Sequence, residues 1–422
     1  MKVFKFGGAS VKDASSVRNV AEIIGKYAHD EQLLIVVSAM GKTTDALEKL
    51  LNGWLEHQQY AQNLEAIRAY HQQIVRDLFP SSGEALLQQL EAGFVQLESL
   101  LTQATYEHYD ESYDQVVSQG EIFSSYIVQA YLQRSQISCQ WLDARAYIMA
   151  DTRWREAKVD WVWSEKIIRN TLLPLLAHQS IITQGFIGGT IGKKTTTLGR
   201  EGSDFSAAIF AYCLEAESLT IWKDVPGILN ADPKRISDTH LYPQLSYNEA
   251  AEMTYYGATV IHPKTIKPLA NRKIPLHVRS FLHPDAPGTC ISDVRLDKIV
   301  PAIIFKPNQC LISFGVRDFT FITEANLSTI LHALASLNIK INLMQNSAIS
   351  FSICTDQESR RIQTLKETLQ DDFIIHFNEK LQLITVKNYD EATIEQVLGK
   401  QAVLLEQKTR NTFQVVIREN KP

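Results

Sequence analysis

The sequence predicts a mainly parallel sheet covered by helices, followed by smaller α+β modules. Short apolar runs alternate with longer amphipathic stretches, and the elements become shorter after the turn-rich segment Pro284–Gly288. The 422 residues are 45% hydrophobic and 21% charged, which excludes a disordered or fibrous chain. We expect a domain over residues 1–295 and a second region over 296–422.

The first domain begins with a predicted βαβ unit. Lys2–Phe6 and Leu33–Ser38 are apolar strands, and the helix Ala14–Tyr27 between them carries apolar residues at helical spacing. Such a crossover indicates parallel strands. A long helical stretch over 43–101 is broken around Pro80–Gly83. Further strands are expected at Ile137–Leu142, Ser180–Gln184, Ser218–Lys223 and Ile274–Val278.

The C-terminal region predicts two modules, over about 305–378 and 379–422. The first combines strands and helices at Cys310–Phe314, Leu327–Leu337, Ile339–Met344, Ile349–Cys354, Glu358–Leu369 and Phe373–Phe377. The second repeats the pattern more weakly at Leu381–Val386, Ala392–Leu398, Ala402–Gln407 and Thr412–Ile417.

Charge and composition exclude several classes of protein. The chain has 42 Lys and Arg against 47 Asp and Glu, a net charge of −5, so a broad basic surface for nucleic acid is not expected. No apolar run approaches the ~20 residues of a membrane helix. The N-terminus leads directly into a strand, so we expect a cytoplasmic protein. The five cysteines are scattered, and no metal site of the protein's own is predicted.

Glycine turns at strand ends suggest anion binding. In Lys5-Phe6-Gly7-Gly8-Ala9-Ser10, the glycines let backbone N–H groups approach an anion, and Lys5 adds a positive charge. The segment Gly41-Lys42-Thr43 resembles the end of a P-loop, but Val36 stands where the first glycine is required, which excludes that motif. Ser38 and Thr44 remain as hydroxyls for a polar substrate, although Thr43 or Thr44 is also suited to capping a helix.

Three further segments carry charged residues that are candidates for binding a substrate or an anion. Glu121 follows Gly120 inside a helical stretch, and is either a partner for a substrate ammonium or a solvated surface residue. The segment Thr195–Asp204 combines glycines, hydroxyls and a helix start, so it predicts an anion site in which Asp204 caps the helix or orients a lysine or metal. Trp222–Lys234 follows a strand as a double turn, a place where nucleotides bind in α/β sheets.

Taken in order, these segments resemble the aspartate kinases of the amino acid kinase family. The matching pieces are KFGGAS, VVSAMGKTTDAL, SQGEIFSS, DAR, TQGFIGG, TTTLGREGSD, WKDVPGILNADPKRI and SYNEAAEMTYYGATVIHPKTIKP. The resemblance implies the amino acid kinase fold followed by ferredoxin-like ACT domains. It also implies transfer of the ATP γ-phosphate, with Mg²⁺, to the side-chain carboxylate of L-aspartate. That is the first step towards lysine, threonine and methionine.

The resemblance implies a role for each matching residue. Lys5 and Asp204 would be catalytic, with Asp204 fixing the lysine. Substrate would be bound by Ser38, Thr44, Glu121, Arg153, Arg200 and Ser203, with Glu121 on the α-ammonium and Arg153 on the α-carboxylate. Nucleotide would be bound by Lys5, Gly7, Gly8, Ser10, Lys223, Asp224, Asn230, Asp232, Pro233 and Lys234.

The sequence departs from the family at several positions. Glu201 replaces a common glycine, and Thr259 stands where many members carry a lysine that reaches the nucleotide, which Lys234 or Lys264 would replace. The ACT resemblance implies a homodimer and feedback by lysine or threonine, with Asn346 and Ser347 as candidate effector residues or as an ordinary hairpin turn. Two alternatives stay open: a family kinase with another acceptor, and a non-catalytic ACT-based amino acid sensor.

Overall fold

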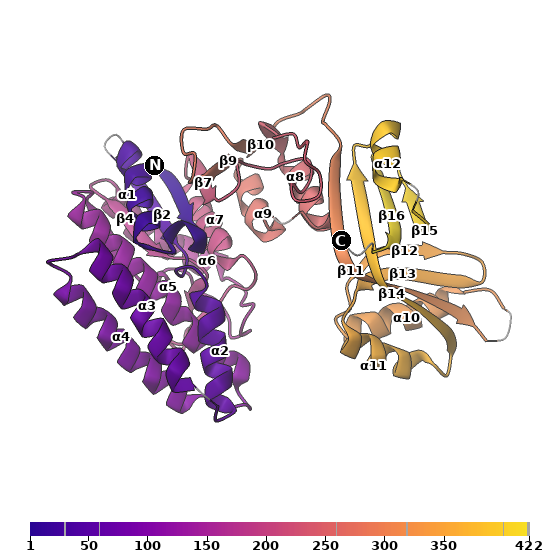
Figure 1. Cartoon of the computed structure of the whole chain (residues 1–422), viewed down its shortest axis with the longest axis horizontal. Helices are drawn as coiled ribbons and strands as arrows, with labels where there is room; N and C mark the ends of the chain where they lie inside the picture. The colour runs from indigo at the N-terminus through magenta and orange to yellow at the C-terminus, as the bar shows by residue number, and fades with distance from the viewer. Residues whose placement is uncertain (29–30, 59, 259, 318–319, 400, 420–422) are drawn as a thin grey trace. The chain divides into compact units, whose positions relative to one another are not determined.

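The computed structural model describes residues 1–419 except 29–30, 59, 259, 318–319 and 400. The chain forms two compact units (Figure 1). The first comprises Met1–Ile228, Leu241–Ala251 and Val260–Arg295, and the second comprises Leu229–His240, Glu252–Thr259 and Leu296–Pro422. Two short segments from the middle of the chain therefore belong with the C-terminal region.

The first unit is built on an eight-stranded sheet with the order β3-β4-β2-β1-β7-β9-β10-β8. All of its pairings are parallel except the one between β9 and β10. In this order the strands are Cys139–Leu142, Ser180–Gln184, Leu33–Val37, Lys2–Phe6, Ser218–Lys223, Leu276–Ser280, Thr289–Ser292 and Gln244–Ser246. The mainly parallel sheet predicted from the sequence is confirmed.

Aromatic packing fills the centre of this sheet. Phe4 and Phe6 alternate along β1 with the buried Val3 and Lys5, and the ring of Phe6 stacks on Trp222 of β7 at 6.0 Å between centroids. All five residues of β2 are buried, as expected for a strand covered on both faces.

Helices cover this sheet and extend from it. Long helices dominate the indigo and purple part of Figure 1, which carries α1 to α5. The predicted break at Pro80–Gly83 is confirmed between α3 and α4. The helices are α1 Ala14–Ala28, α2 Thr43–Leu55, α3 Tyr60–Leu78, α4 Glu84–Gln103, α5 Tyr109–Arg134, α6 Trp161–Leu176, α7 Gly202–Leu214, α8 Tyr247–Tyr256 and α9 Pro263–Asn271. Short 3₁₀ turns lie at η1 Gly8–Val11 and η2 Ala144–Ala146, and a small hairpin joins β5 Ile187–Gly189 to β6 Thr195–Thr197.

The second unit contains one six-stranded antiparallel sheet in the order β12-β13-β11-β14-β16-β15. The two predicted modules share this sheet, because β11 and β14 are each fifteen residues long and pair along their length with bulges near Lys306 and Gln309. The expectation of separate strands at Phe373–Phe377 and Leu381–Val386 is therefore wrong: the left-handed Lys380 lies within one continuous strand. The strands are β11 Ala302–Val316, β12 Ile341–Asn346, β13 Ser350–Asp356, β14 Phe373–Lys387, β15 Val403–Lys408 and β16 Thr412–Arg418, and the helices are α10 Glu324–Ser336, α11 Ser359–Leu369 and α12 Glu391–Leu398.

The segment Leu229–His240 is packed into the core of the second unit. Ala231 is buried in a cluster with residues of β14, β16 and α12, and Ile236 packs against the same cluster. The backbone carbonyl of Asn230 accepts a hydrogen bond from the N–H of Ile303 at 2.7 Å. Most of this twelve-residue segment has no regular structure, so apolar packing and the β11 contact fix its path.

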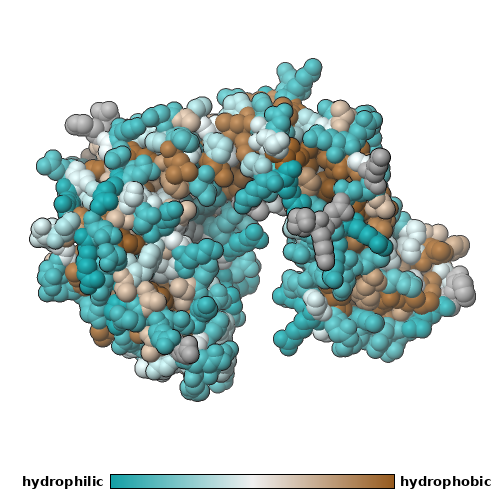
Figure 2. Space-filling model, in the orientation of Figure 1, coloured by the Kyte–Doolittle hydropathy of each residue, from teal (hydrophilic) through white to brown (hydrophobic). Residues whose placement is uncertain are grey.

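One face of the molecule is mostly polar. On the face shown in Figure 2, hydrophilic residues cover most of the area, interrupted by hydrophobic patches. Within the described ranges, no helix is both long enough and apolar enough to cross a bilayer.

Candidate active site

A cavity of about 460 Å³ lies in the first unit where strands β1, β2 and β7 end. The carboxyl ends of parallel strands are the usual place for ligand sites in α/β sheets. The lining residues come from these strand ends, from α5 and from the start of α7. They are Lys5, Gly8, Ser38, Ala39, Gly41, Thr44, Tyr113, Glu121, Arg155, Phe186, Gly199, Arg200, Glu201, Gly202, Ser203, Asp204 and Lys223.

Close backbone contacts explain the glycines around this cavity. A Cβ atom on Gly8 would lie 2.8 Å from the carbonyl oxygens of Ala39 and Gly41. The N–H of Gly41, a residue with φ of +56°, donates to the carbonyl of Gly8 at 3.0 Å. These contacts hold the ends of β1 and β2 together, and no side chain intervenes. On α5, a Cβ on Gly120 would lie 3.0–3.2 Å from Thr43, Ala39 and Leu47, so the glycine allows these residues to pack closely against α5.

Two lysines share one buried aspartate at the centre of the cavity. The Nζ of Lys5 lies 2.7 Å from Oδ1 of Asp204, and the Nζ of Lys223 lies 3.2 Å from Oδ2. Burial alone would raise the pKa of Asp204, but the charges of Lys5 and Lys223 prevail and hold that pKa below its ordinary value. The carboxylate therefore stays ionised and holds both ammonium groups beside the cavity.

Glu121 projects from α5 into the same cavity and is 3% exposed. Burial raises the pKa of Glu121 to about 8, and Lys5 and the backbone N–H of Ala39 oppose that rise. Its Oε2 atom has no hydrogen-bond partner within the described residues. A buried carboxylate oxygen without a partner is costly, so this side chain is suited to receiving a cationic group. The alternative of a solvated surface Glu121 is wrong.

Glu201 adds a second unpartnered carboxylate at the start of α7. Its φ of 52° is in the left-handed region that favours glycine. Burial raises its pKa, Lys223 and Lys5 lower it, and Asp204 raises it further. The Oε2 atom of Glu201 is buried without a hydrogen-bond partner in the described ranges. The substitution that stood out in the sequence therefore places negative charge in the cavity wall.

The structure brings Arg155, and not Arg153, to the cavity. Arg153 is 62% exposed along its side chain and lies against Asp151, with Nε 3.3 Å from Oδ2. Arg155 lies over the ring of Tyr113 at 4.1 Å from its centroid, and its guanidinium is 3.3 Å from Glu48. The predicted contact between Arg153 and substrate is thus corrected, because the side chain of Arg153 turns to solvent and to its own loop.

Asp114 on α5 determines this arrangement. Both of its carboxylate oxygens accept the N–H of Arg155, at 3.1 and 3.0 Å, and they also accept the hydroxyls of Thr196 and Thr197. Asp114 therefore fixes the Arg155 loop and strand β6, which leads to Gly199 and Arg200. Tyr113, Asp114 and Arg155 were not among the site residues predicted from the sequence. The spacing of Tyr113 and Glu121, two helical turns apart on one face of α5, was an available signal.

Arg200 supplies the cavity with a positive charge that is not held in an ion pair. Its side chain is exposed, and no hydrogen bond or ion pair to it is present within the described residues. Ser38, Thr44 and Ser203 also line the cavity, as predicted.

Other predicted nucleotide residues lie outside the cavity lining. Ser10 is fully buried and its hydroxyl donates to the carbonyl of Trp222 at 3.5 Å. Gly7 adjoins Lys5, since a Cβ there would lie 3.4 Å from the Nζ, and Asp224 is exposed just after β7. The remaining four positions, Asn230, Asp232, Pro233 and Lys234, belong to the second unit.

Within the second unit, the side chains of Asn230 and Asp232 form hydrogen bonds that stabilise their own loop. Asn230 donates from Nδ2 to the carbonyl of Pro301 at 3.3 Å and accepts the N–H of His240 at 2.7 Å. Asp232 accepts the N–H of Lys234 at 2.9 Å. Thr259 lies outside the described residues. Lys264 belongs to the first unit, where it forms an ion pair with Glu156.

The candidate effector residues lie at the hairpin between β12 and β13. Both Asn346 and Ser347 are exposed. The Oγ of Ser347 lies 2.8 Å from that of Ser350 and donates to the Ser350 carbonyl at 3.0 Å. The hydroxyl of Ser347 thus closes the turn, and an effector role for the pair stays a prediction.

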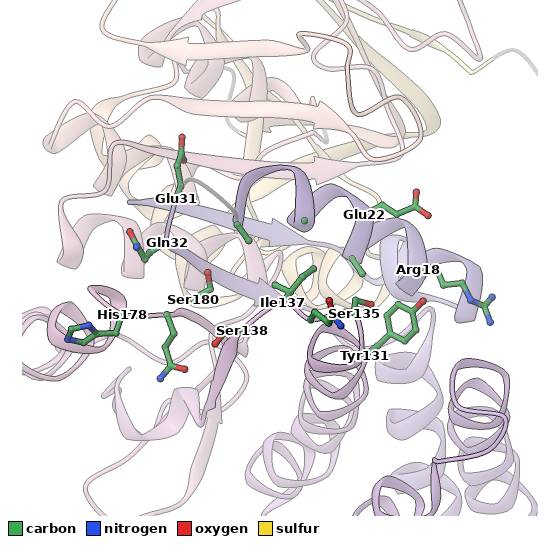
Figure 3. A pocket seen from close by; sticks show the side chains of 15 residues that line it. Arg18, Glu22, Glu31, Gln32, Tyr131, Ser135, Ile137, Ser138, His178 and Ser180 are labelled. Atoms are coloured by element: carbon green, nitrogen blue, oxygen red, sulfur yellow. The ribbon is translucent and has the colours of Figure 1, made fainter.

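A larger cavity of about 680 Å³ lies at the opposite edge of the sheet (Figure 3). Gln32, Ser138 and Ser180 line it where β2, β3 and β4 begin. Its Glu31 pairs with Lys2 at 2.5 Å, and its Arg18 donates to the carbonyl of Asp77 at 2.6 Å. Oε2 of Glu31 has no hydrogen-bond partner within the described residues, but the larger cavity lacks a counterpart to the two lysines held on Asp204, so we place the candidate active site at the smaller cavity.

Chemically, the smaller cavity can hold an anion beside two lysines and the N-terminus of α7, where backbone N–H groups favour negative charge. It can also hold a zwitterion, because the unpartnered Oε2 of Glu121 and the guanidinium of Arg200 both line it. In the described ranges, no cluster of three His, Cys, Asp or Glu side chains could form a metal site.

The comparisons with known proteins agree with this geometry. The model of the amino acid kinase family matches residues 1–280. The bifunctional aspartokinase/homoserine dehydrogenase 2 of Arabidopsis thaliana is 32% identical over 393 residues, covering 90% of this chain and 42% of the plant protein. The lysine-sensitive aspartokinase 3 of Escherichia coli is 32% identical over 356 residues, covering 84% of this chain and 78% of that enzyme. The chain thus spans about two fifths of the length of the bifunctional relatives.

Solved structures give the same result. E. coli aspartokinase III in complex with aspartate and ADP (R-state) matches with a TM-score of 0.86 and 27% identity, covering 99% of this chain and 96% of that one. The complex of the same enzyme with lysine and aspartate (T-state) matches with a TM-score of 0.82 and 28% identity. The chain belongs to the amino acid kinase family and, within it, to the aspartokinases.

Proposed function

We propose that this chain is an aspartate kinase, which transfers the γ-phosphoryl group of ATP to the side-chain carboxylate of L-aspartate. A carboxylate oxygen attacks the γ-phosphorus, the bond to the β-phosphate oxygen breaks, and 4-phospho-L-aspartate and ADP are formed. The observation that carries the proposal is the pair of lysines, Lys5 and Lys223, held on Asp204 beside an anion-binding helix start. The E. coli relative solved with aspartate and ADP supports this choice of substrates.

The acceptor is recognised by its α-ammonium and α-carboxylate groups. Glu121 receives the α-ammonium, because its buried carboxylate has an oxygen without a partner. Arg200 receives the α-carboxylate, because its guanidinium forms no close ion pair within the described residues, whereas Arg155 already contacts Glu48. Ser38, Thr44 and Ser203 supply hydroxyls. An amino acid held by both charged groups on its α-carbon keeps its side-chain carboxylate free to approach Lys5, which lines the same cavity.

Charge neutralisation is the main chemical requirement of this reaction. The aspartate side chain has an ordinary pKa of ~3.9 and is ionised at neutral pH, so no general base is needed. Instead, an anion must approach the triphosphate. Lys5 and Lys223 offset that repulsion, and Asp204 keeps them in place. Asn230, Asp232, Pro233 and Lys234 stay predicted nucleotide contacts.

We infer that ATP binds with Mg²⁺. Mg²⁺ is usually held by one or two carboxylates together with substrate phosphates and water, and not by a cage of protein ligands. Glu201 fits this requirement, because its carboxylate lies in the cavity wall with a buried Oε2 that lacks a partner in the described ranges. A cation held there would supply positive charge that offsets the repulsion between the triphosphate and the acceptor carboxylate.

Assembly and feedback remain part of the proposal. Tandem ACT-like modules support a homodimer, and the E. coli enzyme solved with lysine supports lysine, more than threonine, as the effector. The five cysteines are unpaired, which suits a reducing compartment such as the cytoplasm.

The test is hydroxamate formation from ATP, Mg²⁺ and hydroxylamine with different acceptors. We expect turnover with L-aspartate, and a kcat/KM at least a hundredfold lower with L-glutamate or N-acetyl-aspartate, which lacks the ammonium group. Turnover with another acceptor but not aspartate would indicate a different family kinase. No turnover with any acceptor, by a folded protein that binds lysine, would indicate a sensor.

A further inference from the structure

The 151–158 loop forms part of the wall of the candidate active site. Its ends are joined by the N–H of Asp151, which donates to the carbonyl of Lys158 at 3.0 Å. Its tip carries Arg155, which lines the cavity and has a φ of 66°. A left-handed residue other than glycine costs free energy that surrounding contacts must offset, and such residues gather at functional sites. The tip of this loop is therefore a candidate for a role in the reaction.

The side chain of Arg155 is anchored on two helices, α2 and α5. Its guanidinium carbon lies 4.1 Å from the centre of the Tyr113 ring, and its terminal nitrogens lie 3.3 Å from Glu48 and 3.5 Å from Asp110. Glu48 follows Thr44 by four residues on α2, so it lies on the helix face that carries this cavity residue. Because these contacts already engage the guanidinium, the side chain is suited to holding the loop in place.

The backbone of the loop tip contacts the turn that carries Arg200. The N–H of Ala157 donates to the carbonyl of Thr197 at 3.0 Å, three residues before Arg200. A Cβ atom on Gly199 would lie 3.2 Å from the carbonyl oxygen of Arg155, and Gly199 has a φ of +81°. Both the close approach and this φ favour glycine. The loop tip and the turn therefore fit closely, and a shift of the tip would move the residue next to Arg200.

The next residue of the tip is attached to a third helix. Glu156 forms an ion pair with Lys264, near the start of α9. The neighbouring side chains of Arg155 and Glu156 thus hold the tip on α2 and α5 in one direction and on α9 in the other. Both sets of ion pairs are partly exposed, so each contributes little alone. They act together with Asp114, which accepts the N–H of Arg155.

We propose that Arg155 is a positioning residue for the binding of aspartate, an inference that rests on the proposed function. Its side chain holds the loop tip on α2 and α5, and the tip holds Gly199 so that Arg200 faces the α-carboxylate of the substrate. Arg155 then acts through Arg200 and does not itself bind aspartate. Loss of its side chain should weaken the binding of aspartate and leave the phosphoryl transfer step intact.

The experiment is a double-mutant cycle on Arg155 and Arg200, measured by hydroxamate formation. Arg155→Gly removes the side chain and keeps a residue that adopts the left-handed backbone freely. We expect it to raise the KM for aspartate about five- to tenfold, with kcat and the KM for ATP within about twofold of wild type. In the Arg200→Ala background, the same change should raise that KM by less than about twofold, because the group that Arg155 positions is absent. Arg153→Ala, which removes the exposed arginine of the same loop, is the matched control.

Hydrogen–deuterium exchange without substrate is a second readout that does not depend on activity. Peptides that cover residues 195–204 should exchange faster in Arg155→Gly than in the wild type, and at the wild-type rate in Arg153→Ala. Circular dichroism and the Tm establish that each variant is folded.

Three outcomes would overturn the role of Arg155. The first is a KM for aspartate that Arg155→Gly leaves unchanged. The second is an equal multiplication of this KM in the wild-type and Arg200→Ala backgrounds, which would mean that Arg155 contacts the substrate directly. The third is unchanged exchange over residues 195–204 in folded Arg155→Gly. Absence of wild-type turnover with aspartate would contradict the proposed function, and the exchange experiment alone would then decide whether the loop tip positions the turn.

Discussion

The two cavities at opposite edges of the eight-stranded sheet differ in what their charged groups contact. At the amino edge, in the larger cavity, Oε1 of Glu31 pairs with Lys2 while its Oε2 has no hydrogen-bond partner within the described residues, and Arg18 donates to a backbone carbonyl. At the carboxyl edge, the smaller cavity holds the unpartnered oxygens of Glu121 and Glu201 next to the Lys5–Asp204 pair. Volume alone would select the wrong edge. The feature that distinguishes the carboxyl edge is the pair of lysines held on one buried aspartate, with two unpartnered carboxylate oxygens beside it.

The two arginines of one loop also differ in whether they reach the cavity. Arg153 and Arg155 are two residues apart, yet one lies in solvent and the other over Tyr113 at the cavity. Backbone hydrogen bonds to Asp114 make the difference. We therefore expect substitutions at the carboxyl edge to change activity, and substitutions outside that cavity to leave activity nearly unchanged.

The largest effect should follow removal of the charge that holds the lysines. Asp204→Asn leaves Lys5 and Lys223 without their shared counter-ion, and kcat for hydroxamate formation should fall on the order of 10²–10³-fold, as for the loss of a preorganised electrostatic contact. Asp285→Asn, which removes a surface partner of Lys26, is the control and should keep kcat. A folded Asp204→Asn enzyme with more than half of the wild-type kcat would contradict the role of this aspartate.

A smaller effect, on substrate binding, should distinguish the arginines. Arg200→Ala should raise the KM for aspartate on the order of 10–100-fold, because a hydrogen bond to a charged group contributes ~1.5–3 kcal/mol. Arg153→Ala should change it less than twofold. Steady-state kinetics of both variants at saturating ATP give the answer, and equal effects of the two substitutions would contradict the assignment of Arg200.

A pH-dependent effect on stability should come from Glu121. Its pKa is raised to about 8 in the folded protein from an ordinary 4.5, so the folded state binds more protons than the unfolded state between these values. Wild-type stability therefore falls as pH rises through that window. Glu121→Gln lacks this titration, and its advantage should grow by at most ~1.4 kcal/mol per pH unit from pH 5 to pH 8.

Thermal unfolding at pH 5 and pH 8, in the absence of substrate, measures this difference. Glu111→Gln is the control, because Glu111 lies on the same helix in an exposed ion pair with Lys194. A Tm difference between wild type and Glu121→Gln that is the same at both pH values would show that Glu121 is already ionised in the free enzyme.

The smallest effect is expected at the amino edge. Glu22 lines the larger cavity and is exposed, so Glu22→Ala should leave kcat and the KM for aspartate within twofold of wild type. Its stability should change by about 0.5 kcal/mol or less, as for most surface substitutions. A tenfold change in either kinetic constant would mean that the larger cavity takes part in the reaction.

Much of the fold could be predicted from the alternation of apolar strands and amphipathic helices. Much of the site could be predicted because its residues lie where parallel strands end. Lys5 lies near the end of one parallel strand and Asp204 at the start of a helix, and a parallel sheet brings such positions to one edge. Their ion pair at 2.7 Å agrees with that reasoning. Glu121 could be found because Gly120 is unusual inside a helix and marks close packing.

The remaining features depend on contacts between residues far apart in sequence. Nothing in the residues around Arg153 and Arg155 indicates which one Asp114 will hold. The merged sheet of the second unit results from β14 continuing through Lys380, where local preference suggests a break. The packing of Ala231 and Ile236 into the second unit likewise follows from tertiary contacts with β14, β16 and α12.

The central claim is that the ammonium of Lys5, fixed by Asp204, neutralises charge on the phosphoryl group as it moves to aspartate. The most direct measurement is kcat for aspartyl hydroxamate formation by Lys5→Ala, compared with Lys12→Ala, which removes an exposed lysine outside the cavity. We predict a loss on the order of 10²–10³-fold or more for Lys5→Ala and less than twofold for Lys12→Ala. A folded Lys5→Ala enzyme with a kcat within threefold of wild type would contradict the account.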